Sequence, residues 1–193
     1  MIELERCVEL YNKIPDDIVD MISRLDGVTY SHVIHVCKLC RLIEEELGDR
    51  DEALSQHLLS EAGLVHDIGK YFISTRVLGK PEHLTAIERK VIDIHAYIDY
   101  LVLREYEINK KVCHMTLFHH SLTPFTLDGQ IIACTDENIK SLASMLKTVD
   151  VYDALTTDRP YRRHLVSGQA ADIIRKLDYY DEEVLEILCD LPL

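Results

Sequence analysis

Two adjacent histidines, His119 and His120, stand in the stretch TLFHHSLTPF at residues 116–125, where a helical pattern gives way to a turn-like segment. Histidine is the commonest metal ligand and also a proton carrier near neutral pH. A pair of histidines at the end of a helix predicts partners elsewhere in the chain. We therefore looked for other polar side chains at positions where the hydrophobic pattern predicts the core.

Five further polar residues lie on predicted buried faces or at the ends of predicted helices. His95, for example, shares a helical stripe with Val91 and Ile98, and Asp150 shares one with Leu142 and Leu146. A carboxylate on an apolar face is costly unless it is paired or bound to a metal. With the histidine pair, the candidate set is His32, His66, Asp67, His95, His119, His120 and Asp150.

Each member of this set has a plainer explanation when it is taken alone. A single histidine on an apolar face is more often a hydrogen-bonded core residue than a ligand, and Asp150 could pair with an arginine. The remaining histidines are interpreted as core or solvated side chains: His35, His57, His83, His114 and His164.

Taken together, the seven residues indicate a metal centre, because five separate helices each direct a histidine or aspartate toward the core. Imidazole and carboxylate ligands suit iron, manganese or zinc, and the lack of cysteine among them favours the harder metals. Seven ligands exceed the needs of one tetrahedral ion. Two ions are therefore predicted, with Asp67 able to bridge them through its two oxygens.

Composition limits the classes of function. The chain has 193 residues, 47% of them apolar, and a formal net charge of −13. This charge argues against a broad DNA-binding or membrane-binding surface but allows a small anionic ligand in a pocket that gathers cations. No apolar run approaches the ~18 residues of a membrane span. The first residues, MIELERCVEL, are unlike a signal peptide, so we expect a cytoplasmic protein.

Six dispersed cysteines include one CxxC pair, Cys37 and Cys40. Both fall inside a strong helical pattern, and the sequence has no second CxxC. They are interpreted as packed thiols in a reducing compartment, with a redox or zinc role as the alternative.

The hydrophobic pattern is helical nearly throughout and predicts an all-α bundle with the metal site in its core. Thr29 or Ser31 is expected to cap the third helix, and Thr85 and Glu88 form a capping box at the start of the fifth. Residues 71–84 are expected to form a loop, and residues 121–137 to be irregular. The predicted helices cover residues 3–12, 16–25, 29 or 31 to 47, 52–68, 85–103, 109–120, 138–155, 167–177 and 181–189.

The stretch HDIGK, with an upstream histidine and a downstream aspartate, resembles the HD-domain metal-dependent phosphohydrolases. The resemblance is closer to one branch, the HD-GYP cyclic di-GMP phosphodiesterases, and covers about residues 26–175. Five segments carry it in the same order: DGVTYSHVIHV, LLSEAGLVHDIGKYFIS, VLGKPEHLTAIERKVIDIH, LFHH and VDVYDALTTDRPYR.

This resemblance implies an HD-domain helical bundle over residues 27–193, with residues 1–26 as short helices packed on it or extending it. It also implies a binuclear centre. Iron or manganese is favoured, and zinc, nickel, cobalt or magnesium are alternatives. The implied ligands are His32, His66, Asp67 and Asp150 on one ion, and Asp67, His95, His119 and His120 on the other.

The implied activity is hydrolysis of a cyclic dinucleotide, cyclic di-GMP first, by two-metal water activation with Asp67 and Lys70 as catalytic residues. Lys70, Arg159 and Arg162 would bind the phosphates, since guanidinium forks pair with phosphate oxygens. Tyr161 could stack on a base or pack. The alternative is a solvated basic turn for the arginines and a surface position for Lys70.

The sequence departs from the HD-GYP pattern at three places. After the histidine pair it reads SLTPFTLDGQ, without the Gly-Tyr-Pro stretch that the family links to ligand contact and partner recognition. Ser144 replaces a usual arginine. Val28 stands where members with three metals have a glutamate, so two metals are predicted.

Two other functions remain open. One is a different HD-type reaction on a nucleotide or phosphomonoester, and the other is a nucleotide-binding signalling module with weak or no catalysis. The predicted N-terminal helices could form a homodimer, dock a separate regulatory protein, or simply pack on the bundle.

Overall fold

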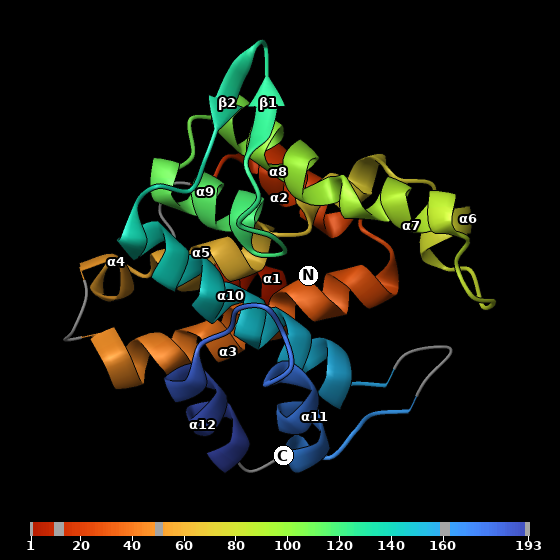
Figure 1. The fold of residues 1–193 in the computed structure, drawn as a ribbon. Helices are drawn as coiled ribbons and strands as arrows, with labels where there is room; N and C mark the ends of the chain where they lie inside the picture. Colours follow the sequence, from red (N-terminus) through yellow and green to blue (C-terminus); the bar gives the residue numbers. More distant parts are fainter. Residues whose placement is uncertain (1, 10–13, 49–51, 159–162, 192–193) are drawn as a thin grey trace.

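The computed structural model describes residues 2–9, 14–48, 52–158 and 163–191 (Figure 1). It confirms the predicted all-α fold, and the described ranges add only one short antiparallel hairpin. In chain order the elements are α1 (Ile2–Glu9), α2 (Asp16–Ser23), α3 (Gly27–Leu47), α4 (Glu52–Ser55), α5 (Leu58–Val65), the 3₁₀ helix η2 (Ile68–Phe72), α6 (Thr75–Leu78), α7 (Ala86–Asp93), α8 (His95–Glu105), α9 (Lys110–Phe118), β1 (Phe125–Leu127), β2 (Gln130–Ile132), α10 (Glu137–Thr156), α11 (Ser167–Ile174) and α12 (Glu182–Asp190).

The centre of the bundle is built from α3, α5, α9 and α10. Helix α5 packs against α3 and α9, and α10 packs against all three. The hairpin stands at one end of the molecule, and α11 and α12 cover α10 at the opposite end (Figure 1). None of the helices in the described ranges combines the length and the apolar character that crossing a membrane requires.

Helix α3 begins earlier than the sequence indicated. The prediction of a cap at Thr29 or Ser31 is wrong, because the carboxylate of Asp26 accepts the backbone N–H groups of Val28 and Thr29 and starts the helix at Gly27. The apolar face of this helix, which includes Val33, Val36 and Ile43, is buried. Cys37 and Cys40 are buried as well and form no disulfide in the described part of the chain.

The predicted single helix over residues 52–68 is wrong, because it divides into α4, α5 and η2. His57 adopts a left-handed conformation, with φ of 59°, between the first two. The carboxylate of Glu44, which is 3% exposed, accepts the backbone N–H of Ser60 at 2.8 Å and its hydroxyl at 2.5 Å. A side chain of α3 thus satisfies one of the free N–H groups at the start of α5.

The predicted helix over residues 85–103 also divides, into α7 and α8, with the break at Ile94. Its capping box is confirmed: Thr85 Oγ1 accepts the Glu88 N–H at 3.2 Å, and the Glu88 carboxylate accepts the Thr85 N–H at 2.7 Å. The predicted loop over residues 71–84 contains the end of η2 and the short helix α6.

Residues 121–137 are not wholly irregular as expected, because they include the hairpin β1–β2. Leu127 pairs with Gln130, which leaves Asp128 and Gly129 as a two-residue turn with φ of 50° and 77°. An Asp-Gly pair suits this turn because both positions need positive φ. The ring of Phe125 packs edge-on against Tyr97 of α8, with centroids 4.8 Å apart.

The N-terminal helices share the core of the bundle. Leu4 of α1 and Ile18 and Ile22 of α2 are buried in the same hydrophobic cluster as α3. The Lys38 ammonium of α3 also pairs with the Glu3 carboxylate at 2.7 Å. Dimerisation or partner docking through these helices stays a prediction.

The buried face of α3 gives a stability prediction. We expect Ile43→Ala to lower the free energy of unfolding by about 2–5 kcal/mol, since it removes fully buried methyl groups and leaves a cavity. Leu42→Ala is the matched control: Leu42 is 39% exposed on the same helix, so its loss should stay within about 1 kcal/mol. Urea unfolding followed by circular dichroism measures both. Equal losses would contradict the assigned core face.

Candidate metal centre

The structure brings all seven predicted ligand residues together. His32 lies on α3, His66 and Asp67 join α5 to η2, and His95 is the first residue of α8. The histidine pair follows α9, and Asp150 lies on α10. All but His120 are buried. Three groups have ligand atoms within 4.8 Å of one another: His95, His119 and His120; His32, His66 and Asp67; and His66, His119 and Asp150.

Three of the histidines are oriented by the same contact. The Nδ1 atoms of His66, His95 and His119 lie 2.9, 2.6 and 2.6 Å from the carbonyl oxygens of the residues three positions earlier. A carbonyl can only accept, so each Nδ1 carries the proton and donates. Nε2 is therefore the atom of each ring that is available to bind a metal.

Asp67 lies between the groups and is 1% exposed. Its Oδ1 lies 3.1 Å from His95 Nε2, whereas its Oδ2 lies 3.9 Å from His32 Nε2 and 3.8 Å from His66 Nε2. Burial alone would raise the pKa of Asp67, but the Lys70 ammonium and the adjacent imidazoles hold that pKa well below its ordinary value. One ionised carboxylate thus presents a separate oxygen to each side of the centre.

Asp150 contacts the histidines on the same side of the centre as His32. Its Oδ1 lies 2.9 Å from His32 Nε2 and 3.7 Å from His66 Nε2. Burial alone would lower the pKa of His32, but hydrogen bonds to Asp150 and Asp153 outweigh it and raise that pKa to about 9. Without a metal, a proton on His32 therefore offsets part of the negative charge.

The residues present fit divalent cations. The Nε2 atoms of His66 and His119 are buried and have no hydrogen-bond partner among the described residues. A buried polar atom without a partner costs about 1–3 kcal/mol. Burial and the neighbouring His120 also hold the pKa of His119 well below its ordinary value, so its ring is neutral. Nitrogen and carboxylate oxygen donors with orphaned lone pairs are what an intermediate or hard divalent ion requires.

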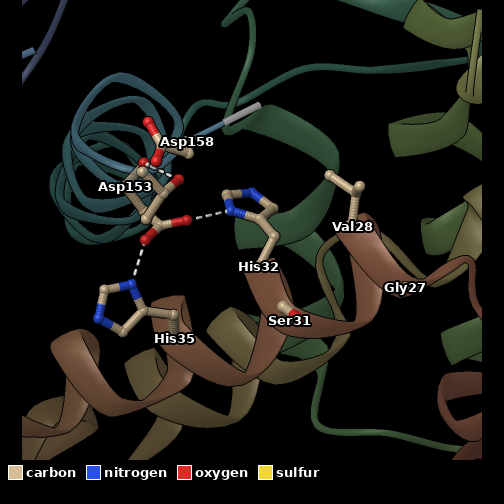
Figure 2. A pocket seen from close by; sticks show the side chains of 8 residues that line it. Gly27, Val28, Ser31, His32, His35, Asp153 and Asp158 are labelled. Carbon is tan, nitrogen blue, oxygen red and sulfur yellow. Dashed lines mark hydrogen bonds and ion pairs between the residues drawn. The ribbon is translucent and has the colours of Figure 1, made fainter. Parts of the chain in front are cut away.

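Sequence reasoning missed the role of Asp153 and treated His35 as an ordinary core or solvated histidine. Asp153 is 1% exposed; its Oδ2 lies 2.5 Å from His32 Nδ1, and its Oδ1 contacts His35 Nδ1 (Figure 2). A carboxylate on the far nitrogen of a ligating histidine fixes the ring and its basicity. The three-residue spacing of Asp150 and Asp153 on one helical stripe was the available signal.

A pocket of about 310 Å³ opens beside this contact, between the start of α3 and the end of α10 (Figure 2). Val28 contributes a hydrocarbon side chain to its lining. The lining residues are Gly27, Val28, Ser31, His32, His35, Asp153, Thr157 and Asp158.

Asp99 is a second buried carboxylate that sequence reasoning missed, although it follows His95 by four residues on α8. Its Oδ1 accepts the backbone N–H of Gly69, and its Oδ2 has no partner within the described part of the chain. Burial and the charge of Asp67 raise the pKa of Asp99 well above its ordinary value, so it is a neutral acid. It holds the 3₁₀ turn that separates Asp67 from Lys70.

The predicted substrate-binding residues divide into two groups. Lys70 lies at the edge of the centre, where its Nζ donates to Asp67 Oδ2 at 2.6 Å and its side chain is 20% exposed. Arg159, Tyr161 and Arg162 fall outside the described residues, so their roles stay predictions.

The close packing of Gly69 gives a metal-binding prediction. A Cβ at Gly69 would lie 2.5 Å from the His95 carbonyl oxygen and 2.9 Å from Asp99 Oδ1, so Gly69→Ala must push η2 away from α8. We expect the affinity of the protein for metal to fall at least about tenfold. Gly168→Ala is the control, because a Cβ there meets nothing within 4 Å. Metal analysis after dialysis checks both, and full retention by Gly69→Ala would contradict the packing.

The pair of His32 and Asp153 gives a pH prediction for the metal-free protein. Asp153→Asn removes one carboxylate that raises the pKa of His32, so this pKa should fall from about 9 toward 6.5. A raised histidine pKa stabilises the fold fully below pH 6.5, and this contribution is lost as pH rises through about 9. Burial alone would raise the pKa of Asp153, but His32 and His35 lower it, so its contribution is present above pH 3.8 and lost below.

The stability deficit of Asp153→Asn should therefore be largest between about pH 4 and 6.5 and shrink toward pH 9. Urea unfolding at several pH values and an NMR titration of the imidazoles measure it. A deficit that grows above pH 7 would overturn this account.

The chain is similar in sequence to several proteins named as phosphodiesterases. A cyclic di-GMP phosphodiesterase from Pseudomonas aeruginosa is 33% identical over 79% of this chain and 35% of its own length. A 3′3′-cGAMP-specific phosphodiesterase from Vibrio cholerae is 28% identical over 77% of this chain and 31% of its own length. A cyclic di-GMP phosphodiesterase from Thermotoga maritima is 27% identical over 91% of this chain and 48% of its own length. The chain thus spans less than half the length of these three relatives.

The family match covers the elements that position the centre. The profile of the HD domain family matches residues 29–157, more than half of the chain, from the first turns of α3 to the end of α10. The chain therefore belongs to the HD domain family.

Proposed function

We propose that this chain is a metal-dependent phosphodiesterase domain that hydrolyses a cyclic dinucleotide, with cyclic di-GMP as the first candidate. The observation that carries the proposal is the position of Asp67, whose two oxygens face two separate imidazole groups. The printed activities of the relatives supply the substrate class.

The proposed ligands of one ion are His32, His66, Asp67 and Asp150, and those of the other are Asp67, His95, His119 and His120. The nitrogen and oxygen donors favour iron or manganese over metals that prefer sulfur. When bound, a pair of such ions neutralises phosphate charge and makes water available as a nucleophile near neutral pH.

The side chains of this chain provide the remaining requirements of the reaction. The ionised Asp67 and the neutral ring of His119 keep their donor atoms free of protons, whereas His32, whose pKa is raised to about 9, would release a proton when an ion binds. Burial of six of the seven residues excludes bulk water and strengthens electrostatic interactions at the reacting phosphate. Hydrolysis joins a water oxygen to phosphorus and releases the ribose 3′ oxygen.

Lys70 is proposed to complement the phosphate at the edge of the centre. Its Nζ already contacts Asp67 Oδ2, so a phosphate oxygen that docks beside Asp67 meets the same ammonium. Arg159 and Arg162 are proposed to bind the second phosphate, and Tyr161 to contact a base. Arginine suits this role because its planar fork binds phosphate oxygens in pairs.

The hairpin favours a second candidate, hydrolysis of 3′3′-cGAMP or another nucleotide phosphodiester. Where the HD-GYP pattern places its Gly-Tyr-Pro loop, this chain forms β1–β2, and Phe125 packs on α8. A different loop after the histidine pair would change the groups that a bound nucleotide meets without changing the candidate ligands. A relative specific for 3′3′-cGAMP belongs to the same set of matches.

The test is a panel of substrates, assayed with the unaltered protein and with a variant that lacks the Asp67 carboxylate. Protein purified without oxygen should hold about two ions per chain and hydrolyse cyclic di-GMP or 3′3′-cGAMP faster than a chromogenic phosphodiester. Asp67→Ala should lose both ions and at least about a thousandfold of the activity, because one carboxylate serves both sites. Asp172→Ala is the control, since Asp172 is exposed on α11. Nucleotide binding without turnover would instead indicate a binding module.

A further inference from the structure

Lys147 of α10 is a buried cation that the proposed reaction does not use. The residue is 5% exposed, and its ammonium pairs with the Asp178 carboxylate at 2.6 Å. The same ammonium lies 3.6 Å from the ring centre of Tyr179 and 3.5 Å from the carbonyl oxygen of His120. A lysine is rarely buried without a specific set of partners. Here the partners come from the segment between α11 and α12 and from the turn after α9.

These contacts end on the backbone that carries the histidine pair. The hydroxyl of Tyr179 donates to the carbonyl of Phe118, the last residue of α9, while Lys147 reaches the carbonyl of His120. The last carbonyls of a helix have no partner inside it, and a cation near this end is also favoured by the helix dipole. The two contacts therefore hold the peptide unit before His119 and the one after His120, which flank the histidine pair.

The segment at residues 178–181 is itself fixed to α10. The backbone N–H of Asp181 donates to Thr148 Oγ1 at 2.8 Å, one residue after Lys147. Burial and the Asp178 charge raise the pKa of Tyr179, so its hydroxyl stays protonated and remains a donor. Helix α10 thus fixes the position of this segment. Tyr179 of the segment and Lys147 of α10 both bind backbone carbonyls at the end of α9.

We propose that Lys147 is a positioning residue for the second metal site, the one proposed to use Asp67, His95, His119 and His120. Lys147 acts together with Tyr179: both hold the end of α9 so that His119 and His120 face His95. This inference rests on the proposed function. His120 is the ligand candidate most dependent on it, because His120 is exposed and its Nε2 contact is with His95 Nε2 at 3.1 Å. The group formed by His32, His66 and Asp67 contains no residue from the end of α9, although His119 also lies near His66 and Asp150.

The experiment is a stepwise Mn²⁺ titration of the metal-free full chain, followed by calorimetry and electron paramagnetic resonance. Lys147→Met keeps the length and apolar character of the stem but removes the charge. We expect the first ion to bind as in the unaltered protein and the second to bind about 10–100-fold more weakly. The spin coupling between two adjacent ions should be lost at the same Mn²⁺ concentration.

Three variants sharpen the result. Lys147→Arg should restore part of the second affinity, because it returns a cation. Tyr179→Phe should weaken binding of the second ion and leave binding of the first unchanged. This change keeps the ring over the Lys147 ammonium but deletes the hydroxyl that donates to the Phe118 carbonyl. Lys140→Met is the matched control, because Lys140 lies on the same helix and pairs only with Glu137 among the described residues.

The outcomes separate this inference from the proposed function. If the unaltered protein fails to bind two ions, the proposed function fails first. If it binds two and Lys147→Met and Tyr179→Phe bind both with unchanged affinity, the positioning role is overturned. Should Lys147→Met lose its helical circular dichroism, Tyr179→Phe alone decides, because it removes a single hydroxyl.

Discussion

Burying several carboxylates in one small region costs free energy, and much of the surrounding structure serves to offset that cost. Asp67, Asp99, Asp150 and Asp153 are all at most 7% exposed. Ionised carboxylates in such surroundings are tolerated only when each is neutralised or paired. Asp99 is neutralised by its own proton, and Asp153 by His32 and His35. Asp67 and Asp150 keep their charge near the buried Nε2 atoms of His66 and His119, which have no hydrogen-bond partner among the described residues. Divalent cations would satisfy both requirements at once, so metal binding would also stabilise the fold.

The same constraint explains why helices end where the candidate ligands begin. Helices α5, α7 and α9 each stop one or two residues before a histidine whose Nδ1–H donates to a carbonyl in the last turn, those of Gly63, Ile92 and Thr116. The last carbonyls of a helix are otherwise without a partner. One contact thus completes the helix end and fixes the tautomer that leaves Nε2 free. Structure and proposed chemistry are satisfied by the same atoms.

The sequence was sufficient for the helical fold and for bringing seven candidate residues into one set, because periodicity and costly polar residues are both visible in a single chain. It was not sufficient for the helix breaks or for the supporting residues. The start of α5 depends on Glu44, and the orientation of His32 depends on Asp153, which is 121 residues away in the sequence. Lys147 finds Asp178 across 31 residues. Such pairings depend on tertiary packing, which local propensity does not record.

The net charge of −13 places a further requirement on any anionic substrate. Lys70 and Lys147, the lysines that contact the centre or its supports, are each paired with a carboxylate at 2.6 Å. These two pairs are therefore close to neutral, and the proton on His32 offsets only part of the negative charge of Asp150 and Asp153. A phosphodiester approaching the metal-free centre would be repelled at short range, where low polarity strengthens the repulsion. Bound cations reverse the sign of this field. In the proposed reaction, metal loading must therefore precede substrate binding, and the metals act in recognition as well as in chemistry.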